Sequence, residues 1–334
     1  MGGCSSSYAT IAEETSGDSA LQENVGLDGS DLPDHVLSLT FDDGPGRNTE
    51  ALASYLHDEG IAATFFVIGN TAKGHEDVLA KVRSLGHLVG NHTLTHTPMT
   101  SSPDPVGEVA KTDAIIAPFV TDGMFLFRAP QGKWNAGVAT ELNAAGLERY
   151  VGHVHWTAGG RFSARTSMDW NCWRSKTAVA ECGRGYLNEV ERARRGIVLM
   201  HDIHDTTFEL VRWLVPRLRA RGFGFARLDA SPAIAATLRG VGGRPSAVAQ
   251  SAPPASPPKA AYSASPFELA SLARRGYLRD EGIPAEASFC DALTRGSIDA
   301  ATIADAAVYS GRVSAKDVDG SYLNALSQLV ACGD

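Results

Sequence analysis

The stretch VLSLTFDDGP, residues 36–45, runs from an apolar segment into two adjacent carboxylates and a Gly-Pro turn. Short apolar segments of this kind recur as far as Leu228, and longer amphipathic stretches separate them. The later segments are ATFFVIG (63–69), HLVGNHT (87–93), FLFRAP (125–130), YVGHVHW (150–156), GIVLMHD (196–202) and GFGFARL (222–228). This alternation of strands and helices predicts an α/β domain built on a parallel sheet.

Several of these strands end in polar residues, and this favours a particular arrangement. In a (β/α) barrel the chemistry lies on the rim formed by the carboxyl ends of the strands. The sequence offers about seven strand-helix units, fewer than the usual eight. We therefore predict a distorted or incomplete (β/α) barrel. A doubly wound open sheet is the alternative, because strand order cannot be deduced from the sequence.

Changes of composition divide the rest of the chain. Residues 1–34 are rich in Ser, Gly and acidic residues, which predicts a flexible leader before the α/β domain at 35–232. Residues 233–265 are rich in Ala, Pro and Ser, which predicts a linker. Residues 266–334 contain short helical patterns and predict a small helical module that binds the cell wall or a partner, or packs on the barrel. The helical patterns are PFELASLARRG (266–276), AATIADAAVYSG (300–311) and YLNALSQLVA (322–331).

Charge and cysteine content limit the class of protein. The 334 residues carry a formal net charge of -8, which disfavours nucleic acid as a partner. No run approaches the roughly 18 apolar residues of a transmembrane span. Among five cysteines, Cys172 could pair with Cys182, or Cys290 with Cys332, in an oxidising compartment. Cys4, before a Ser-rich stretch, could be a lipid attachment site. We therefore expect an extracytoplasmic protein that is secreted, periplasmic or anchored to the envelope.

Three strand ends carry residues suited to metal chemistry. Asp42 and Asp43 are neighbouring carboxylates, so one could bind a metal while the other serves as base. The alternative is that they only cap the following helix. His92 and His96 are four residues apart, a spacing that places both imidazoles on one face of a helical turn. Two histidines and one aspartate would leave a fourth zinc position open. Arg128 could hold a carboxylate ionised and aimed.

Two later segments could supply a general acid and an apolar wall beside it. His201 ends the apolar segment GIVLMHD and is the candidate general acid. Asp169 could hydrogen-bond and tune that histidine, while Trp170 and Trp173 could form an apolar or sugar-stacking wall. The alternative is an aromatic core with Asp169 as a helix cap.

Five short motifs, taken in order, resemble one known family. The motifs are TFDDGP (40–45), NHTLTH (91–96), FRAPQG (127–132), MDW (168–170) and LMHD (199–202). Their order and spacing are similar to the motif series of the polysaccharide deacetylases, also called the NodB-homology family or carbohydrate esterase family four. The resemblance covers about Val36 to Leu228. It implies a distorted, NodB-like barrel with a divalent metal, usually zinc; such a histidine-rich site would also accept Co²⁺ or Ni²⁺.

The resemblance also implies roles for the residues of the first three motifs. In the family's pattern the second Asp of the first motif and both histidines bind the metal, which here are Asp43, His92 and His96. The first Asp, here Asp42, is the base. The motif arginine, here Arg128, holds it.

The last two motifs imply an acid and a substrate pocket. By the same matching Asp169 tunes the acid His201, Trp170 lines the pocket and Leu199 contacts the acetyl methyl group. The chain departs from the family at Gln131, where an aromatic residue is usual. The backbone N–H at this position could still help to hold an oxyanion.

A longer segment precedes the LMHD motif. Residues 170–186 include Trp173 and the pair Cys172 and Cys182. We expect them to form a disulfide-braced loop that shapes the groove.

The function implied by the resemblance is hydrolysis of acetyl groups. The expected substrate is N-acetylglucosamine in a polysaccharide such as peptidoglycan or a chitin-like oligomer. Two alternatives remain from the sequence: an O-acetyl esterase acting on acetylated xylan or a similar glycan, and a non-catalytic protein that binds glycan or anchors to the wall.

Overall fold

The structure of the protein is a computed structural model. It describes residues 21, 27–160, 166–245, 263–279, 281–285, 287–310 and 312–331. Cys4, most of the predicted leader, the centre of the predicted linker and Cys332 lie outside these residues. The Cys290–Cys332 pairing and the lipid attachment at Cys4 therefore stay predictions.

A parallel sheet forms the centre of the larger part of the molecule. Strand β1 (Val36–Asp42) is buried along its whole length. It pairs in parallel with β2 (Thr64–Val67), β4 (Gly196–His201) and the short β5 (Gly224–Phe225). Strand β3 (Leu88–Asn91) pairs with β2, so the order of the main path is β3-β2-β1-β4. The predicted parallel α/β fold is confirmed.

Isolated parallel bridges continue the pairing from β3 back to β4. They join Asn91 to Phe127, Leu126 to Val151, and Ala158 to Val198. The pairing thus follows an irregular ring, and the open, doubly wound alternative is not adopted. The segments 125–130 and 150–156, predicted as strands, contribute bridges in place of full strands. Pro130 lacks a backbone N–H and Gln131 has φ 57°, and both features prevent a regular ladder.

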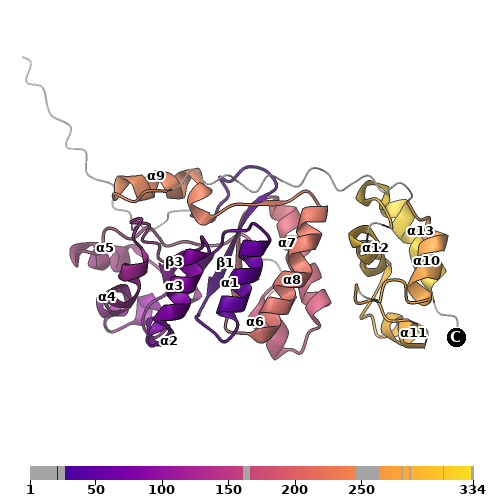
Figure 1. Ribbon diagram of the computed structural model, residues 1–334, viewed down its shortest axis with the longest axis horizontal. Coiled ribbons are helices and arrows are strands. Elements are labelled where there is room, and N and C mark those ends of the chain that lie inside the picture. Colours follow the sequence, from indigo (N-terminus) through magenta and orange to yellow (C-terminus); the bar gives the residue numbers. More distant parts are fainter. Residues whose placement is uncertain are drawn as a thin grey trace, which may run out of the picture.

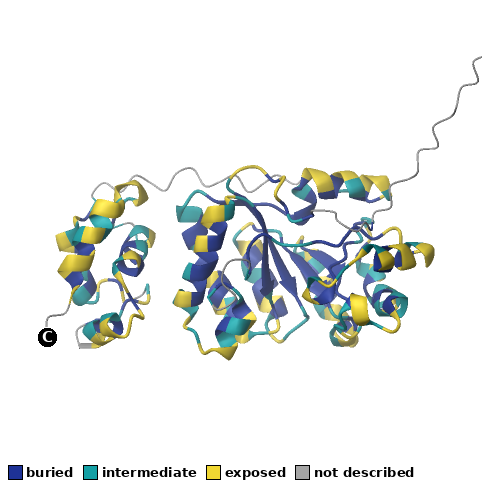
Figure 2. Cartoon of the chain, turned by 180° about the vertical axis from the view of Figure 1, so that it is seen from behind, coloured by how far each residue is buried: buried dark blue, intermediate teal, exposed yellow. Residues whose placement is uncertain are grey.

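Helices cover the sheet (Figure 1). The apolar faces of α1 (Thr49–Asp58), α7 (Val179–Ala193) and α8 (Asp205–Ala220) pack on β1, β2 and β4 in the largest hydrophobic core. Figure 2 shows the strands buried and the outer faces of the helices exposed. Within the described part of the chain no helix is both long and apolar enough to cross a membrane. The helices of this part are α1 (Thr49–Asp58), α2 (Gly69–Ala72), α3 (Glu76–Ser84), α4 (Pro105–Ile116), α5 (Ala136–Ala144), α6 (Asp169–Arg174), α7 (Val179–Ala193), α8 (Asp205–Ala220) and α9 (Pro232–Gly240).

The ends of the α/β part differ from the composition-based boundaries. Leu27 and Leu32 are buried, so the last residues of the predicted leader pack on the fold. Helix α9 occupies the start of the predicted linker. Ile234 and Leu238, four residues apart, are buried against the barrel, and the Ser231 hydroxyl accepts a hydrogen bond from the backbone N–H of Ile234. The prediction that residues 233–240 belong to a linker is wrong, because this capped, amphipathic pattern forms a helix.

Four helices follow the linker: α10 (Pro266–Arg274), α11 (Ala287–Thr294), α12 (Ala300–Tyr309) and α13 (Gly320–Val330). Three of them lie where the helical patterns predicted them. They share an apolar core that includes Leu269, Phe289, Ile303 and Leu326. The division of the chain into a catalytic domain and a separate helical module stays a prediction.

Candidate active site

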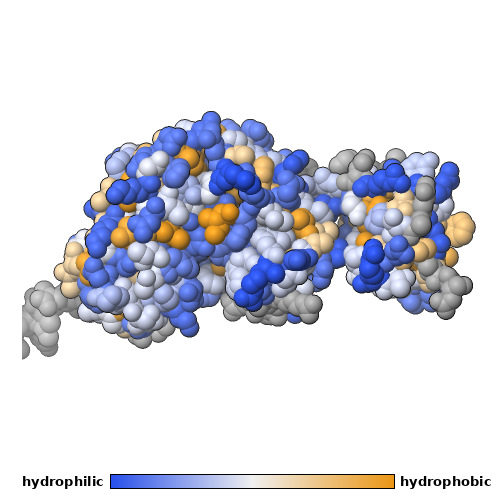
Figure 3. Space-filling view, turned by 90° about the horizontal axis from the view of Figure 1, so that it is seen from below, coloured by the Kyte–Doolittle hydropathy of each residue, from blue (hydrophilic) through white to orange (hydrophobic). Residues whose placement is uncertain are grey.

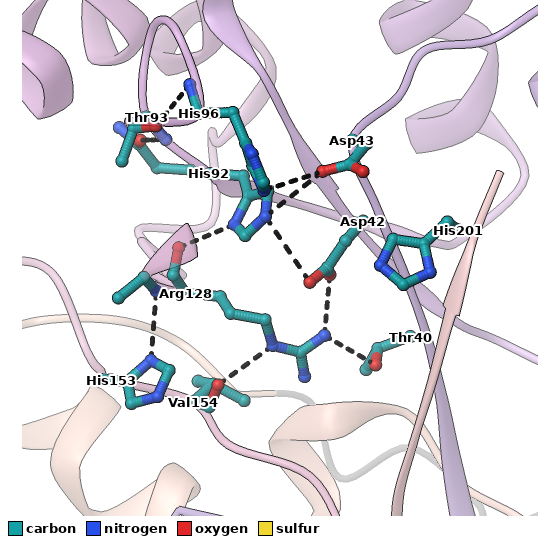
Figure 4. Close-up of polar contacts among 12 residues, drawn as sticks. Thr40, Asp42, Asp43, His92, Thr93, His96, Arg128, His153, Val154 and His201 are labelled. Atoms are coloured by element: carbon teal, nitrogen blue, oxygen red, sulfur yellow. Dashed lines mark hydrogen bonds and ion pairs between the residues drawn. The ribbon is translucent and has the colours of Figure 1, made fainter. Parts of the chain in front are cut away.

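Polar side chains from three strand ends meet on one edge of the sheet. Asp42 ends β1 and Asp43 follows it, His92 follows β3, and His201 ends β4. Parallel strands present their carboxyl ends on the same edge, and this brings together residues that are far apart in sequence. Figure 4 shows them facing one another. A cavity of about 550 Å³ opens there, lined by Asp42, Asp43, His92, His96, Ala129, Gln131, Lys133, Trp156, Met168, Trp170, Leu199 and His201.

Asp43, His92 and His96 form a candidate metal site. One ligand atom from each lies within 4.8 Å of the others. The Asp43 Oδ1 atom is 3.4 Å from His92 Nε2 and 3.3 Å from His96 Nε2, and it is buried without a hydrogen-bond donor. His92 Nδ1 lies 2.8 Å from the Arg128 carbonyl and must donate to it, so in the neutral ring Nε2 directs a lone pair toward Asp43. Converging acceptors of this kind fit a cation.

The protonation states at this cluster suit metal binding. Burial tends to raise the pKa of Asp43, but the imidazoles of His92, His201 and His96 outweigh it and lower this pKa to about 2. Burial lowers the pKa of His96 from its usual value. The carboxylate is therefore ionised and His96 is neutral at neutral pH, and these are the forms that coordinate metal.

The segment that carries the two histidines is a loop. Thr93 and His96 have φ values of 69° and 62°, which are incompatible with a helical turn. The Asn91 side chain accepts a hydrogen bond from the Thr93 N–H, and the Thr93 hydroxyl accepts one from the His96 N–H. Residues 92–96 therefore do not form a helical turn, the geometry in which the four-residue spacing would place both imidazoles on one face, because these side chains give the backbone an alternative set of partners. The two imidazoles nevertheless lie together, with ring centroids 5.1 Å apart.

Asp42 is paired with a fully buried arginine. Arg128 Nη1 donates to Asp42 Oδ1 at 2.7 Å and to the Thr40 hydroxyl at 2.9 Å. Its Nε and Nη2 donate to the carbonyls of Val154 and His155 at 2.9 and 3.2 Å. The guanidinium therefore has one fixed orientation, and it fixes the Asp42 carboxylate beside the cavity.

His201 is paired with a buried aspartate on the other side of the cavity. Its Nδ1 lies 2.7 Å from Asp169 Oδ1, and its backbone N–H donates to Asp169 Oδ2 at 2.7 Å. Burial tends to lower the pKa of His201, but the Asp169 carboxylate outweighs it and raises this pKa to about 9. Since Nδ1 donates to Asp169, Nε2 is the ring atom left to exchange a proton in the cavity.

The remaining predicted residues lie around this centre. Gln131 and Leu199 line the cavity, and Trp170 lines it with 39% of its surface exposed. Cys172 and Cys182 form a disulfide that joins α6 to α7. Trp173 lies outside the cavity lining; it packs on the core and its indole N–H donates to the Thr207 hydroxyl at 3.0 Å.

The structure adds residues that the sequence did not reveal. Lys133, Trp156 and Met168 complete the lining of the cavity. The Tyr186 hydroxyl donates to the Leu199 carbonyl and accepts from the backbone N–H of Asp169, so it ties β4 to α6. A hydroxyl so far from the motifs in sequence gives no local signal of this role.

Comparison with known proteins identifies the family. The polysaccharide deacetylase family model matches residues 29–150. A chitooligosaccharide deacetylase of Rhizobium leguminosarum bv. trifolii is 30% identical over 221 residues, which cover 61% of this chain and 95% of that protein. The chain belongs to the polysaccharide deacetylase family.

Two further similarities agree with this assignment. A peptidoglycan-N-acetylglucosamine deacetylase of Bacillus cereus is 29% identical over 57% of this chain and 68% of its own length. The crystal structure of the catalytic domain of a peptidoglycan N-acetylglucosamine deacetylase from Eubacterium rectale matches with a TM-score of 0.50 at 22% identity, covering 61% of this chain and 94% of that chain. The second similarity shows the fold alone.

The family model covers only part of the site of this polysaccharide deacetylase. Asp42, Asp43 and Arg128 lie within the matched residues 29–150, whereas Asp169 and His201 follow them. His201 nevertheless faces Asp42 in the cavity, although it lies beyond the matched segment (Figure 4).

Glu108 of α4 holds the histidine loop, and its replacement should weaken metal binding. Its Oε2 accepts hydrogen bonds from the backbone N–H groups of Leu94 and Thr95, and its Oε1 accepts from the Thr95 hydroxyl. Because residues behind metal ligands orient them, Glu108→Ala is expected to lower metal affinity about 10- to 100-fold. Glu108→Gln keeps an acceptor oxygen, so its metal affinity should fall less than that of Glu108→Ala. Metal titration of both variants tests this; equal affinity of Glu108→Ala and the parent chain would contradict it.

Proposed function

We propose that this deacetylase is a metal-dependent hydrolase that removes N-acetyl groups from N-acetylglucosamine in a polysaccharide, either peptidoglycan or a chitin-like oligomer. One observation carries the proposal. A carboxylate held by arginine, Asp42 with Arg128, and an imidazole held by carboxylate, His201 with Asp169, flank the Asp43 cluster from two sides. The two sequence relatives, a chitooligosaccharide deacetylase and a peptidoglycan-N-acetylglucosamine deacetylase, support this substrate class.

The proposed metal is a divalent cation held by Asp43, His92 and His96. Two imidazole nitrogens and one carboxylate are typical of catalytic zinc, and Co²⁺ or Ni²⁺ would also suit this donor set. When bound, such a cation supplies Lewis acidity that polarises the acetyl carbonyl and acidifies water.

The chain's own residues then act as base and acid. Asp42, held in place by Arg128, takes a proton from the attacking water. The backbone N–H of Gln131, on the cavity wall, stabilises the oxyanion. His201 donates the Nε2 proton to the departing nitrogen, so that a neutral amine leaves. Leu199 packs against the acetyl methyl group.

The acid favours an amide over an ester as substrate. An amine leaves poorly without a proton, whereas an alkoxide depends less on one. Because the pKa of His201 is raised to about 9, the ring is protonated at neutral pH and can supply that proton. The O-acetyl esterase is therefore the second candidate.

Release of acetate tests the proposal. The substrates are N-acetylglucosamine oligomers, peptidoglycan and acetylated xylan, each assayed before and after chelation and again with Zn²⁺ or Co²⁺ restored. Metal-dependent release from either N-acetylated substrate is expected. Release from xylan alone would favour the esterase, and no release with metal bound would favour a glycan-binding protein.

The setting of the enzyme is also part of the proposal. We propose a catalytic domain that ends after α9, a linker and a helical module at 266–334. The disulfide between Cys172 and Cys182 supports an oxidising, extracytoplasmic compartment, since disulfides persist there. The polysaccharides of the cell envelope, which include the proposed substrate peptidoglycan, also lie outside the cytoplasm.

The pH dependence of the reaction should reveal the His201–Asp169 pair. His201 must be protonated to act as acid, so kcat/KM should hold below about pH 9 and fall as pH rises through that value. In Asp169→Asn the anion that favours imidazolium is lost, the pKa of His201 drops, and the fall should move to lower pH. Full pH profiles of both proteins test this. An alkaline limb unchanged by the substitution would contradict it.

A further inference from the structure

A second cavity lies between the α7–α8 surface and the C-terminal helices. Figure 3 shows these helices as a lobe that touches the larger part of the molecule along one side. The cavity measures about 420 Å³. Its charged lining residues are Arg184, Arg217, Arg279, Arg295, Glu281 and Asp305, and its apolar lining includes Trp213, Ile283 and Ile298. Four cations thus face two carboxylates among the described lining residues.

One of the two carboxylates is already paired. Asp305 Oδ1 lies 2.5 Å from Arg221 Nη2, and the same arginine also binds Glu191 at 2.7 Å. Arg221 does not line the cavity. Asp305 therefore serves Arg221 as well as the lining residues Arg184 and Arg217, so the four lining guanidinium groups share two carboxylates, one of which also pairs outside the cavity.

Two of the guanidinium groups have buried nitrogens without an acceptor. Arg217 is 4% exposed and lies 4.1 Å above the ring of Trp213 and 4.5 Å from that of Tyr309. Its Nη1 donates to the Trp213 carbonyl, but its Nε has no partner, and neither has Nη1 of Arg184. Burial lowers the pKa of Arg217 to about 10. Asp305 and Glu281 offset part of the charge of Arg217. The two buried N–H groups still lack an acceptor, which is costly, so a cavity lined in this way favours an anion.

We propose that this cavity is a second ligand site, which binds a small molecule bearing an oxyanion, either a carboxylate or a phosphate. Guanidinium groups bind both oxyanions through paired N–H donors. A cavity of this volume with apolar walls accepts a small organic molecule. Its lining comes from α7 and α8 and from residues 279–306, so a bound anion ties the C-terminal helices to the deacetylase part. The inference does not depend on the reaction at the active site.

Calorimetric titration of the full-length chain tests the site. The probes are inorganic phosphate, glucose 6-phosphate and glucuronic acid, with glucose as the neutral control. At least one anion is expected to bind saturably, and glucose is expected not to bind. The anion that binds most tightly shows whether the site prefers a phosphate or a carboxylate. Absence of binding by all three anions would overturn the proposal.

Variants locate the bound anion. The double variant Arg279→Ala/Arg295→Ala should weaken binding about tenfold or more, since it removes two charged donors. Arg239→Ala removes the same kind of charge at an exposed position of α9, outside the cavity lining, and should leave affinity unchanged. Unchanged affinity in the double variant would place the anion elsewhere and overturn the proposal.

The melting temperature gives an independent readout. Arg217→Met replaces the buried cation with a side chain of similar size, so the ligand-free variant should melt at or above the temperature of the parent chain. The anion should raise the melting temperature of the parent but not of this variant. An equal rise in both would contradict a role for Arg217.

Discussion

Replacing His201 by alanine is expected to reduce turnover on N-acetylated substrate about 10²- to 10⁴-fold, the usual contribution of a general acid. His201 approaches the cavity from β4 and its ring is held by Asp169, not by the metal cluster. The proposed ligands Asp43, His92 and His96 are untouched, so metal content should stay that of the parent chain. Turnover and bound metal are measured on the same preparation. His57→Ala, an exposed histidine on α1, is the matched control.

The size of the loss should depend on the leaving group. A nitrophenolate departs without a proton, so 4-nitrophenyl acetate should be hydrolysed by His201→Ala with a smaller loss than the N-acetylated glycan shows. Equal losses on both substrates would mean that His201 acts on binding or on the attacking water. Near-parent turnover on the glycan would remove His201 from the acid role.

Much of this site follows from where the apolar segments end. The apolar segments at 36–41, 87–93 and 196–202, predicted as strands, contain most or all of β1, β3 and β4. Because they are parallel, the polar residues behind them had to meet on one edge, and the sequence predicted that meeting of Asp42, His92 and His201. The separate roles of Asp42 and Asp43 came from the family resemblance, since either carboxylate alone satisfies the residue pattern.

The supporting contacts were beyond the reach of local patterns. Glu108 lies 13 residues from Thr95, and Thr207 lies 38 residues from the Asp169 carboxylate to which it donates. The packing of α4 and α8 on the sheet determines which side chains meet, and the spacing of residues along the chain does not reveal it. The same holds for the loop at 92–96, whose shape depends on hydrogen bonds made by Asn91 and Thr93.

The misplaced start of the linker has a physical reason as well. Alanine and proline dominate the composition from residue 232 onward, and composition alone suggests a spacer. Proline at the first helical position is favourable, however, and alanine is the best helix former. The apolar pair Ile234 and Leu238, at helical spacing, was the signal that mattered.

Asp42→Asn is expected to cost both activity and stability. Turnover should fall about 10²- to 10⁴-fold with the loss of the base. Arg128 is fully buried and Asp42 is its one carboxylate partner among the described ion pairs, so the substitution leaves an uncompensated cation in the core. Removing one member of a buried pair costs about 3 to 5 kcal/mol of unfolding free energy. Denaturant unfolding at one saturating metal concentration measures this cost.

A double-mutant cycle separates the pairing from other effects of the substitution. Arg128→Met alone leaves Asp42 without its guanidinium and leaves the carbonyls of Val154 and His155 without their donors. In Asp42→Asn/Arg128→Met neither charge is stranded, so its loss of stability should be smaller than the sum of the two single losses, although activity stays low. Strictly additive losses would show that the two charges do not interact, and would contradict the view that Arg128 holds Asp42 in place for its work as base.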